Sequence, residues 1–229
     1  EKPIGGNSPF MANRGVLFLD EFPEFSREVL ESLRQPLEDG TICVSRAAGS
    51  VTYPARVLLV TACNPCPCGF YGDPAGQCSC TPHALERYHR KLSGPILDRI
   101  DLHVAVPRLK PEELVSLEGE QGETSESVRG RVQAARSRQQ ERWRERGYSC
   151  NAELPEKVLR RNLGMEDDVK PFLAQAMKGM RLSGRGFSRV LRVARTIADL
   201  DGVPEVSVPH VAESLSYREG EALSQGWRR

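Results

Sequence analysis

Two groups of residues in this sequence carry side chains that can do chemistry. The first is the adjacent pair Asp20-Glu21, which follows the apolar run 16–19, and this run predicts a buried parallel strand. In an open α/β sheet, ligands bind beyond the carboxyl ends of buried parallel strands. One carboxylate there can hold the Mg²⁺ of a nucleotide, and its neighbour can polarise the attacking water. Taken alone, the pair fits solvated acids at an ordinary strand end better.

The second group is a set of closely spaced cysteines. Five of the seven cysteines lie between positions 63 and 80, and four of them form two C-x-C pairs separated by nine residues. Four thiolates can bind Zn²⁺ tetrahedrally at about 2.3 Å. One intervening residue within each pair is tighter than the usual spacing of zinc ligands. The sequence therefore leaves a zinc site, free thiols and a disulfide open for Cys66, Cys68, Cys78 and Cys80.

Length and composition set the limits for these sites. The 229 residues suffice for a buried core and for one or two domains. Lys and Arg total 32 against 31 Asp and Glu, so any nucleic-acid surface has to be a local basic feature. No apolar run approaches the ~18 residues of a membrane span. With clustered cysteines and no signal-peptide pattern at the start, we expect a cytoplasmic protein with reduced or metal-bound thiols.

The first half of the chain alternates predicted strands and helices, which is typical of a parallel α/β sheet. After the strand that ends at Asp20, a helix is expected from Ser26 to Gly40, ended or kinked by Pro36. Two β-rich runs at 41–54 predict a hairpin with Arg46 near its tip. Further apolar runs predict strands at 56–62 and 102–107, and a short helix at 83–92 lies between them.

The second half is predicted to be helical. A Gly-, Glu-, Ser- and Thr-rich stretch at 118–127 suits a mobile linker. The next helix, 128–146, carries seven arginines against two glutamates, and Val128, Val132, Ala135 and Trp143 mark its apolar face. Such a charged face is more often solvated than bound to a partner. Further helices are expected at 155–162, 166–180, 185–200 and 208–217.

Several segments in a fixed order resemble the magnesium-chelatase-like AAA+ proteins, specifically the ComM/YifB family. The resemblance implies a P-loop NTPase core, with a partial parallel sheet and a presensor-1 β-hairpin, followed by an α-helical lid. It also implies a ring, expected to be a hexamer, that uses ATP and Mg²⁺ to drive DNA branch migration in natural transformation. The segments that carry the match are GVLFLDEFPEF, LRQPLEDG, SGPILDRIDLHVAVP and LSGRGFSRVLRVARTIADLDG.

The resemblance also implies roles for individual residues. Asp20 and Glu21 match the Walker B pair, and Asn64 matches the sensor 1 residue that orients the attacking water. Arg99 matches the arginine finger that reaches a neighbouring subunit's nucleotide, with a structural ion pair to Asp98 or Asp101 as the alternative. Arg185 matches the sensor 2 arginine, with an ion pair inside the lid as the alternative.

The hairpin at 41–54 matches an insert that points into the central pore of related ring helicases. In that position Arg46 would contact DNA, although a solvated turn arginine is an equally good interpretation. The expected domains are a partial ATPase core at 1–110, a linker at 111–127 and a helical lid with sensor 2 at 128–229.

The sequence departs from the family pattern at one essential motif. A P-loop requires Gly-x-x-x-x-Gly-Lys-Ser/Thr, and no Gly-Lys pair occurs here. We therefore interpret the chain as a fragment of an ATPase, or less readily as a defective relative, and expect this chain alone to be inactive. Two alternatives to DNA remodelling stay open. They are a motor subunit for metal insertion into a porphyrin, and a non-catalytic module that docks into a ring.

Overall fold

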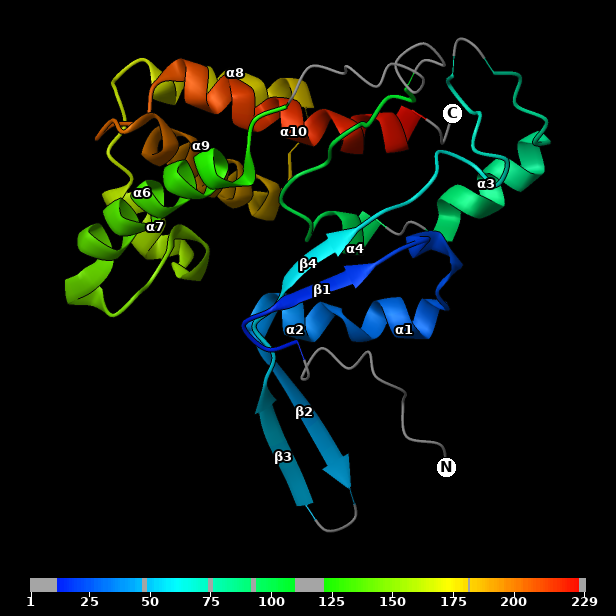
Figure 1. Cartoon of the computed structure of the whole chain (residues 1–229), viewed down its shortest axis with the longest axis horizontal. Helices are drawn as coiled ribbons and strands as arrows, with labels where there is room; N and C mark the ends of the chain where they lie inside the picture. Colours follow the sequence, from blue (N-terminus) through cyan, green and yellow to red (C-terminus); the bar gives the residue numbers. More distant parts are fainter. Residues whose placement is uncertain are drawn as a thin grey trace. The chain divides into compact units, whose positions relative to one another are not determined.

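The chain forms two compact units in a computed structural model (Figure 1). The first unit comprises Glu1–Ile100 with Ser224–Arg229, and the second comprises Asp101–Leu223. None of the helices in the described part of the chain is both long and apolar enough to cross a membrane. The structure describes residues 12–46, 49–73, 76–91, 94–109, 122–180 and 182–226.

The first unit contains a small parallel sheet made of β1, Val16–Leu19, and β4, Leu58–Thr61. Their register runs from Val16 opposite Leu58 to Leu19 opposite Thr61. The expectation of a fully buried strand is wrong for β1, because its residues alternate between exposed and buried. Leu17 and Leu19 pack into the core, whereas the side chain of Phe18 is 58% exposed.

The strand predicted at 102–107 is not formed, which corrects the expected sheet. This segment has no regular structure and begins the second unit, where the His103 N–H donates to the carbonyl of Tyr217 at 2.9 Å. Its apolar side chains stay exposed, Val106 at 86%. No described strand lies beside it, and an apolar run forms a strand only when a partner edge accepts its backbone hydrogen bonds. Within the described ranges the parallel sheet has two strands.

Short helices cover the buried face of β1. The predicted helix is split into α1, Arg27–Ser32, and α2, Arg34–Asp39, with Pro36 in the first turn of α2. Proline is tolerated there because the first N–H groups of a helix have no intrahelical acceptor. The Ser26 hydroxyl caps α1, and Gly40 ends α2 with φ +65°, as expected from the sequence. The 3₁₀ turn η1, Phe22–Glu24, connects β1 to α1.

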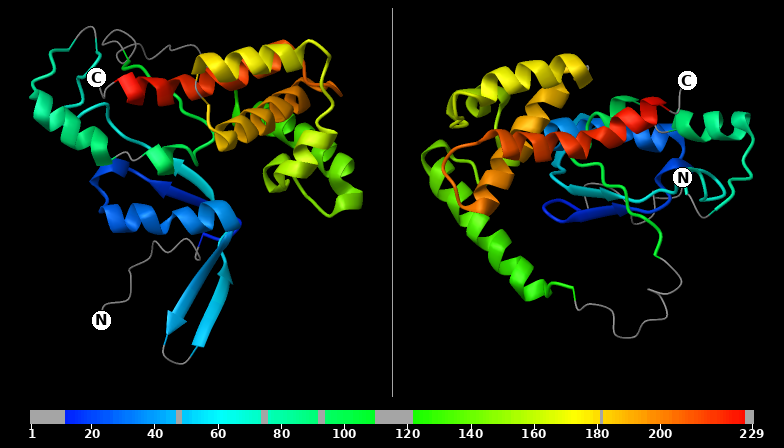
Figure 2. Two further views of the ribbon diagram at one scale, coloured as in Figure 1. Left: turned by 180° about the vertical axis from the view of Figure 1, so that it is seen from behind. Right: turned by 90° about the horizontal axis from the view of Figure 1, so that it is seen from above.

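The predicted hairpin is present and extends away from the parallel sheet (Figure 2). It consists of β2, Thr41–Arg46, and β3, Gly49–Pro54, which pair antiparallel throughout. Residues 47 and 48 at its turn and the side chain of Arg46 lie outside the described residues. The first unit is completed by α3, Pro82–Lys91, and α4, Gly94–Leu97.

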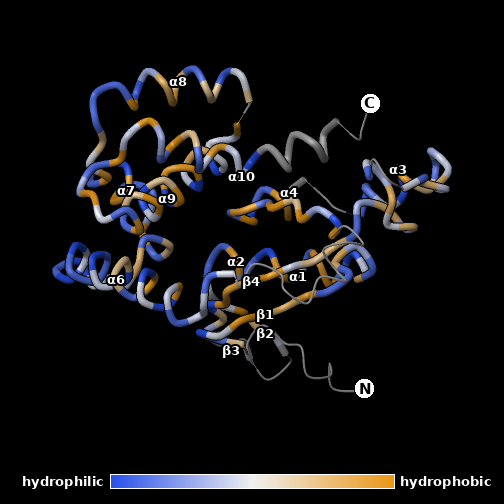
Figure 3. The backbone as a smooth tube through the Cα atoms, turned by 45° about the horizontal axis from the view of Figure 1, so that its top comes forward, coloured by the Kyte–Doolittle hydropathy of each residue, from blue (hydrophilic) through white to orange (hydrophobic). Residues whose placement is uncertain are grey.

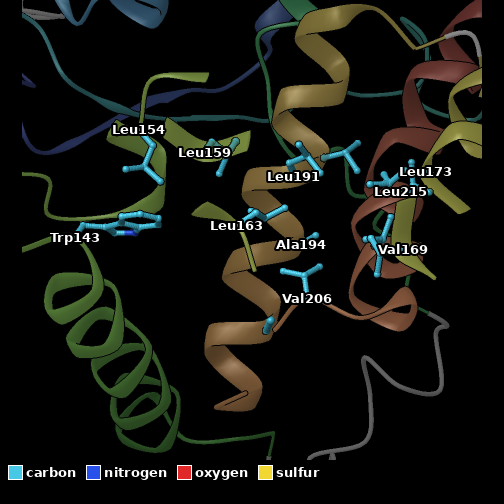
Figure 4. Close-up of a cluster of buried hydrophobic side chains, with 13 residues drawn as sticks. Trp143, Leu154, Leu159, Leu163, Val169, Leu173, Leu191, Ala194, Val206 and Leu215 are labelled. Carbon is cyan, nitrogen blue, oxygen red and sulfur yellow. The ribbon is translucent and has the colours of Figure 1, made fainter. Parts of the chain in front are cut away.

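The second unit is a helical bundle, as predicted. The buried side chains come mostly from α9 and from the segments packed around it (Figure 4). Residues 110–121, which include most of the predicted linker, lie outside the described residues, and 125–127 belong to α6. The helices are α6, Ser125–Trp143; α7, Glu156–Asn162; α8, Val169–Met180; α9, Gly184–Asp201; and α10, Val208–Gly226, with 3₁₀ turns η2, Arg144–Arg146, and η3, Asn151–Glu153.

Helix α6 buries a narrower face than its sequence suggests. Ala135, Gln139 and Trp143 are buried, whereas Val128 and Val132 in its first half are exposed. Most of α6 is hydrophilic, as its colour shows in Figure 3. Only the second half of this helix is therefore held by the bundle core.

A buried polar network joins α6 to α9. The Asp199 carboxylate accepts hydrogen bonds from Arg142 at 2.6 Å and from Asn151 at 2.9 Å, and it forms an ion pair with Arg195 at 3.0 Å. The Trp143 indole N–H donates to Asn151 at 2.9 Å. Because these buried groups bond to one another across the two helices, the network specifies how the helices pack. Arg142 and Arg195 therefore have a structural role in the helical bundle.

Candidate nucleotide site and cysteine cluster

The two parallel strands end at the same edge of the sheet. The Ala62 N–H donates to the carbonyl of Leu19, and the Phe22 N–H donates to the carbonyl of Ala62, both at 3.0 Å. These bonds extend the pairing beyond the strands and hold the segment after β1 beside the segment after β4. Asp20, Glu21 and Asn64 are thus brought to one edge, and all three are exposed. Carboxylate and amide oxygens at such an edge suit a hard cation such as Mg²⁺.

Glu21 adopts an unusual backbone conformation at this edge. Its φ of 49° and ψ of 43° lie in the left-handed region, which glycine favours and a glutamate rarely adopts. The Asp20 carboxylate accepts the Glu21 N–H at 2.9 Å, and this bond closes the turn. Non-glycine residues held in this region cost on the order of 1 kcal/mol and concentrate at functional sites. The strain therefore singles out Glu21 within the acidic pair.

The backbone around Asn64 is held by α3. The Tyr88 hydroxyl donates to the Asn64 carbonyl at 3.0 Å, and His89 Nε2 donates to the Pro65 carbonyl at 2.9 Å. Both aromatic side chains are buried, and burial raises the pKa of Tyr88 to about 12. The phenol therefore stays protonated and keeps donating its hydrogen bond. These contacts fix the main chain at Asn64 and leave its side chain exposed at the sheet edge.

Arg99 is buried within the first unit. Its guanidinium forms an ion pair with Glu38 at 2.6 Å and also donates to the carbonyl of Pro95. The Arg99 side chain is 2% exposed and that of Glu38 is 34% exposed. In this conformation the arginine faces the end of α2. To reach a nucleotide on another subunit it would have to leave this ion pair.

The other two candidate arginines lie on separate elements. Arg185 is exposed in the first turn of α9, where the Ser183 hydroxyl caps the helix by accepting the Gly186 N–H at 3.0 Å. Arg46 ends β2, opposite Gly49. Each of these positions agrees with its place in the sequence pattern, and the roles stay predictions.

The four candidate zinc ligands come together in the loop between β4 and α3. Their sulfur atoms all lie within 4.8 Å of one another. The Cys66 sulfur is 3.3 Å from that of Cys68 and 3.8 Å from that of Cys78. All are free thiols in the structure, and Cys66 is fully buried. The other three cysteines, Cys43, Cys63 and Cys150, are not part of this group.

The thiols of the cluster differ in acidity. A backbone hydrogen bond from Phe70, with further donors around it, lowers the pKa of Cys68 to about 5. Burial raises the pKa of Cys80 to about 12. Cys68 therefore takes up negative charge more readily than Cys80.

Sequence reasoning missed the residues that support these sites. Glu38 lies 61 positions before Arg99, and nothing in the local pattern connects them. Tyr88 and His89 are ordinary residues of a predicted helix in the sequence, and nothing there indicates that they bind the main chain at 64–65. Arg99 pairs with Glu38 rather than with Asp101, which forms an ion pair with Arg189 at 2.5 Å. Contacts of this kind join residues that lie far apart in the sequence, so only the folded structure reveals them.

Comparison with known proteins decides the family. The model of the magnesium chelatase subunit ChlI matches residues 4–114, and the model of its C-terminal region matches residues 122–218. The chain belongs to the magnesium-chelatase-like family that includes ComM and YifB. Membership of this family implies an AAA+-type fold, and the observed small parallel sheet with its helices agrees with that fold.

The curated relatives of this chain include longer bacterial proteins. It is 45% identical over 215 residues to competence protein ComM of Haemophilus influenzae, covering 94% of this chain and 41% of ComM. It is 42% identical over 213 residues to the uncharacterized protein YifB of Escherichia coli, covering 93% and 41%. A magnesium-chelatase 38 kDa subunit of Chlorobaculum parvum is 26% identical over 205 residues, covering 87% and 50%. The chain thus spans half or less of the length of these relatives.

Proposed function

We propose that this chain provides the Mg²⁺-binding and water-activating side of an ATP site in a ring-forming AAA+ ATPase that remodels DNA. The observation that supports the proposal is the shared edge of β1 and β4, which Asp20 and Glu21 follow on one strand and Asn64 on the other. Such an edge is where open α/β sheets bind ligands. The left-handed conformation of Glu21 adds a second, independent indication.

Each side chain at the edge has a distinct task in this proposal. Asp20 accepts the Glu21 N–H with one oxygen and offers the other to the Mg²⁺ that accompanies ATP. Glu21 takes the proton of the attacking water, and Asn64 orients that water. Arg99 acts on a neighbouring subunit, and Arg185 has the sensor 2 role that the family pattern gives it. The sequence contains no P-loop motif, so the β- and γ-phosphates are held by residues other than these.

DNA is the proposed substrate because relatives at 40 to 45% identity include a competence protein. Hydrolysis in a ring of identical subunits would drive branch migration of DNA through the pore. The second candidate function, metal insertion into a porphyrin, rests on the chelatase subunits, which are only about 25% identical. The higher identity favours the first candidate.

Both proposals can be tested in a ComM chimera, in which this chain replaces the matching segment of Haemophilus influenzae ComM. The unmodified chimera should hydrolyse ATP, and DNA should stimulate the reaction. Magnesium insertion into a porphyrin, without stimulation by DNA, would favour the chelatase candidate. Absence of any hydrolysis in a folded ring would support a docking module instead.

Arg46→Ala in this chimera should reduce the stimulation of ATP hydrolysis by DNA while basal hydrolysis stays unchanged. Copies of the hairpin in the pore would form a ring of positive charge that follows the phosphate backbone, and such binding weakens steeply with salt. The matched control is Arg136→Ala on the exposed face of α6. The measurement is the ATPase rate against DNA concentration at two salt concentrations. If Arg46→Ala keeps full stimulation, the hairpin does not contact DNA in the pore.

A further inference from the structure

The loop between β4 and α3 brings four cysteine sulfurs together at the end of the strand that leads to Asn64. We propose that Cys66, Cys68, Cys78 and Cys80 bind one Zn²⁺ ion, and that this ion fixes the main chain that carries Asn64. The metal site is inferred from the positions of the four sulfur atoms and does not depend on the proposed function. Only the importance of positioning Asn64 rests on the proposed ATPase function.

The distances between the sulfur atoms fit a single ion. With zinc–sulfur bonds of about 2.3 Å, the edge of a regular tetrahedron of sulfurs is about 3.8 Å. The Cys66–Cys78 and Cys68–Cys78 sulfur distances are 3.8 Å and 3.6 Å, and the Cys66–Cys68 distance is 3.3 Å. A disulfide would need about 2.05 Å. An iron–sulfur cluster would hold the cysteines on separate iron atoms and therefore farther apart.

The backbone of the loop is folded to direct these sulfurs inward. The Gly69 N–H donates to the carbonyl of Cys66 at 3.0 Å, and the φ of Gly69 is +80°. This turn places Cys66 and Cys68 on the same side of the loop, and a residue with a side chain would be strained there. The backbone N–H groups of Phe70 and Ser79 donate to the Cys68 sulfur. Such hydrogen bonds orient and stabilise metal-bound thiolates.

Four protein sulfurs complete the coordination of zinc and leave no open position, so the site is structural rather than catalytic. Zinc is favoured over Mg²⁺ or Ca²⁺, because those cations prefer oxygen ligands. The ion would also neutralise thiolates that otherwise repel one another in a partly buried loop.

The cluster is connected to the candidate nucleotide site through α3. Thr81 follows Cys80 directly, and its hydroxyl caps α3 by accepting the Ala84 N–H at 3.2 Å. Tyr88 and His89, near the end of α3, bind the carbonyls of Asn64 and Pro65. The hydrogen bond from Tyr88 to Asn64 closes a ring of chain that includes both cysteine pairs and α3, and the metal would link the two pairs inside this ring. Loss of the ion should loosen this ring and release Asn64.

The first test is the metal content of this chain, purified without added metal. Elemental analysis should find about one zinc per chain. Cys66→Ser and Cys80→Ser should each lower the zinc content at least about fivefold, because a serine hydroxyl is a poor zinc ligand. Cys43→Ser, Cys63→Ser and Cys150→Ser are the matched controls and should keep it. In the unmodified chain, Co²⁺ exchanged for zinc should show a thiolate-to-cobalt charge-transfer band, a readout independent of any variant's folding.

The second test is amide hydrogen exchange before and after removal of the metal by a chelator. Exchange should rise across 64–91 and stay unchanged in α9, which serves as an internal control within the same chain. Returning zinc should restore the protection. Unchanged exchange at 64–66 in metal-free protein would overturn the positioning of Asn64 by the metal.

Three results would overturn the metal site itself. The first is a folded, metal-free protein whose four cluster thiols all react with a thiol reagent. The second is iron together with inorganic sulfide, which would show an iron–sulfur cluster. The third is zinc that persists unchanged in both Cys66→Ser and Cys80→Ser.

Discussion

Glu21→Gln in the ComM chimera should abolish turnover while ATP still binds. We expect hydrolysis to fall about 10²–10⁴-fold, the usual contribution of a positioned general base. Glutamine keeps the size and the hydrogen-bonding oxygen of glutamate but cannot take a proton from water. Since Asp20, the proposed Mg²⁺ ligand, is untouched, affinity for ATP should change little.

The matched control for this change is Glu24→Gln. Glu24 lies three residues further along in η1, is exposed, and pairs with Lys91 at 3.1 Å. An exposed pair of this kind contributes little to stability, so Glu24→Gln should keep both binding and hydrolysis. Steady-state hydrolysis and equilibrium binding of labelled ATP separate the two effects. Normal turnover by Glu21→Gln, or equal loss in both variants, would remove Glu21 from the catalytic step.

Arg99→Ala should produce an equally large loss of hydrolysis, of about 10³–10⁵-fold, if its guanidinium acts as an arginine finger. A finger of this kind would act on a neighbouring subunit, so mixed rings should recover activity. Rings that combine Arg99→Ala with Glu21→Gln subunits contain interfaces where an intact Arg99 faces an intact Glu21. Hydrolysis by this mixture, when neither variant is active alone, is the expected result.

The ion pair with Glu38 supplies the control for Arg99. If Arg99 serves only as a structural partner of Glu38, Glu38→Gln should impair the protein as much as Arg99→Ala does. Removing one member of a buried pair commonly costs about 3–5 kcal/mol, and less where one partner is partly exposed, as Glu38 is. The finger account predicts that Glu38→Gln loses some thermal stability but keeps hydrolysis. Equal loss of hydrolysis in both variants, without recovery in mixed rings, would contradict it.

Local patterns in the sequence predict most elements of this chain. Ser26 and Gly40 mark the ends of the α1–α2 segment because capping depends on neighbouring backbone groups alone. The hairpin at 41–54 follows from its two β-rich runs in the same way. The paired cysteines also show in the sequence, since a ligand spacing is a local property.

Features that depend on distant partners could not be predicted. The apolar run at 102–107 has the composition of a strand, yet it forms none, because a strand exists only beside another strand. The burial of Arg99 against Glu38 joins positions 61 residues apart. The segment after Glu21 is likewise held by a distant partner, because the Phe22 N–H donates to the carbonyl of Ala62 in the folded sheet.

The central claim is that the Mg²⁺ of bound ATP lies at the shared edge of β1 and β4. Metal-directed cleavage tests it most directly. In the ComM chimera with ATP bound, Fe²⁺ replaces Mg²⁺, and ascorbate with peroxide then generates radicals that cut the backbone beside the metal. We predict cuts between Leu19 and Phe22 and around Asn64, dependent on nucleotide and lost in Asp20→Asn. Nucleotide-dependent cuts elsewhere in the chain, with none at this edge, would contradict the account.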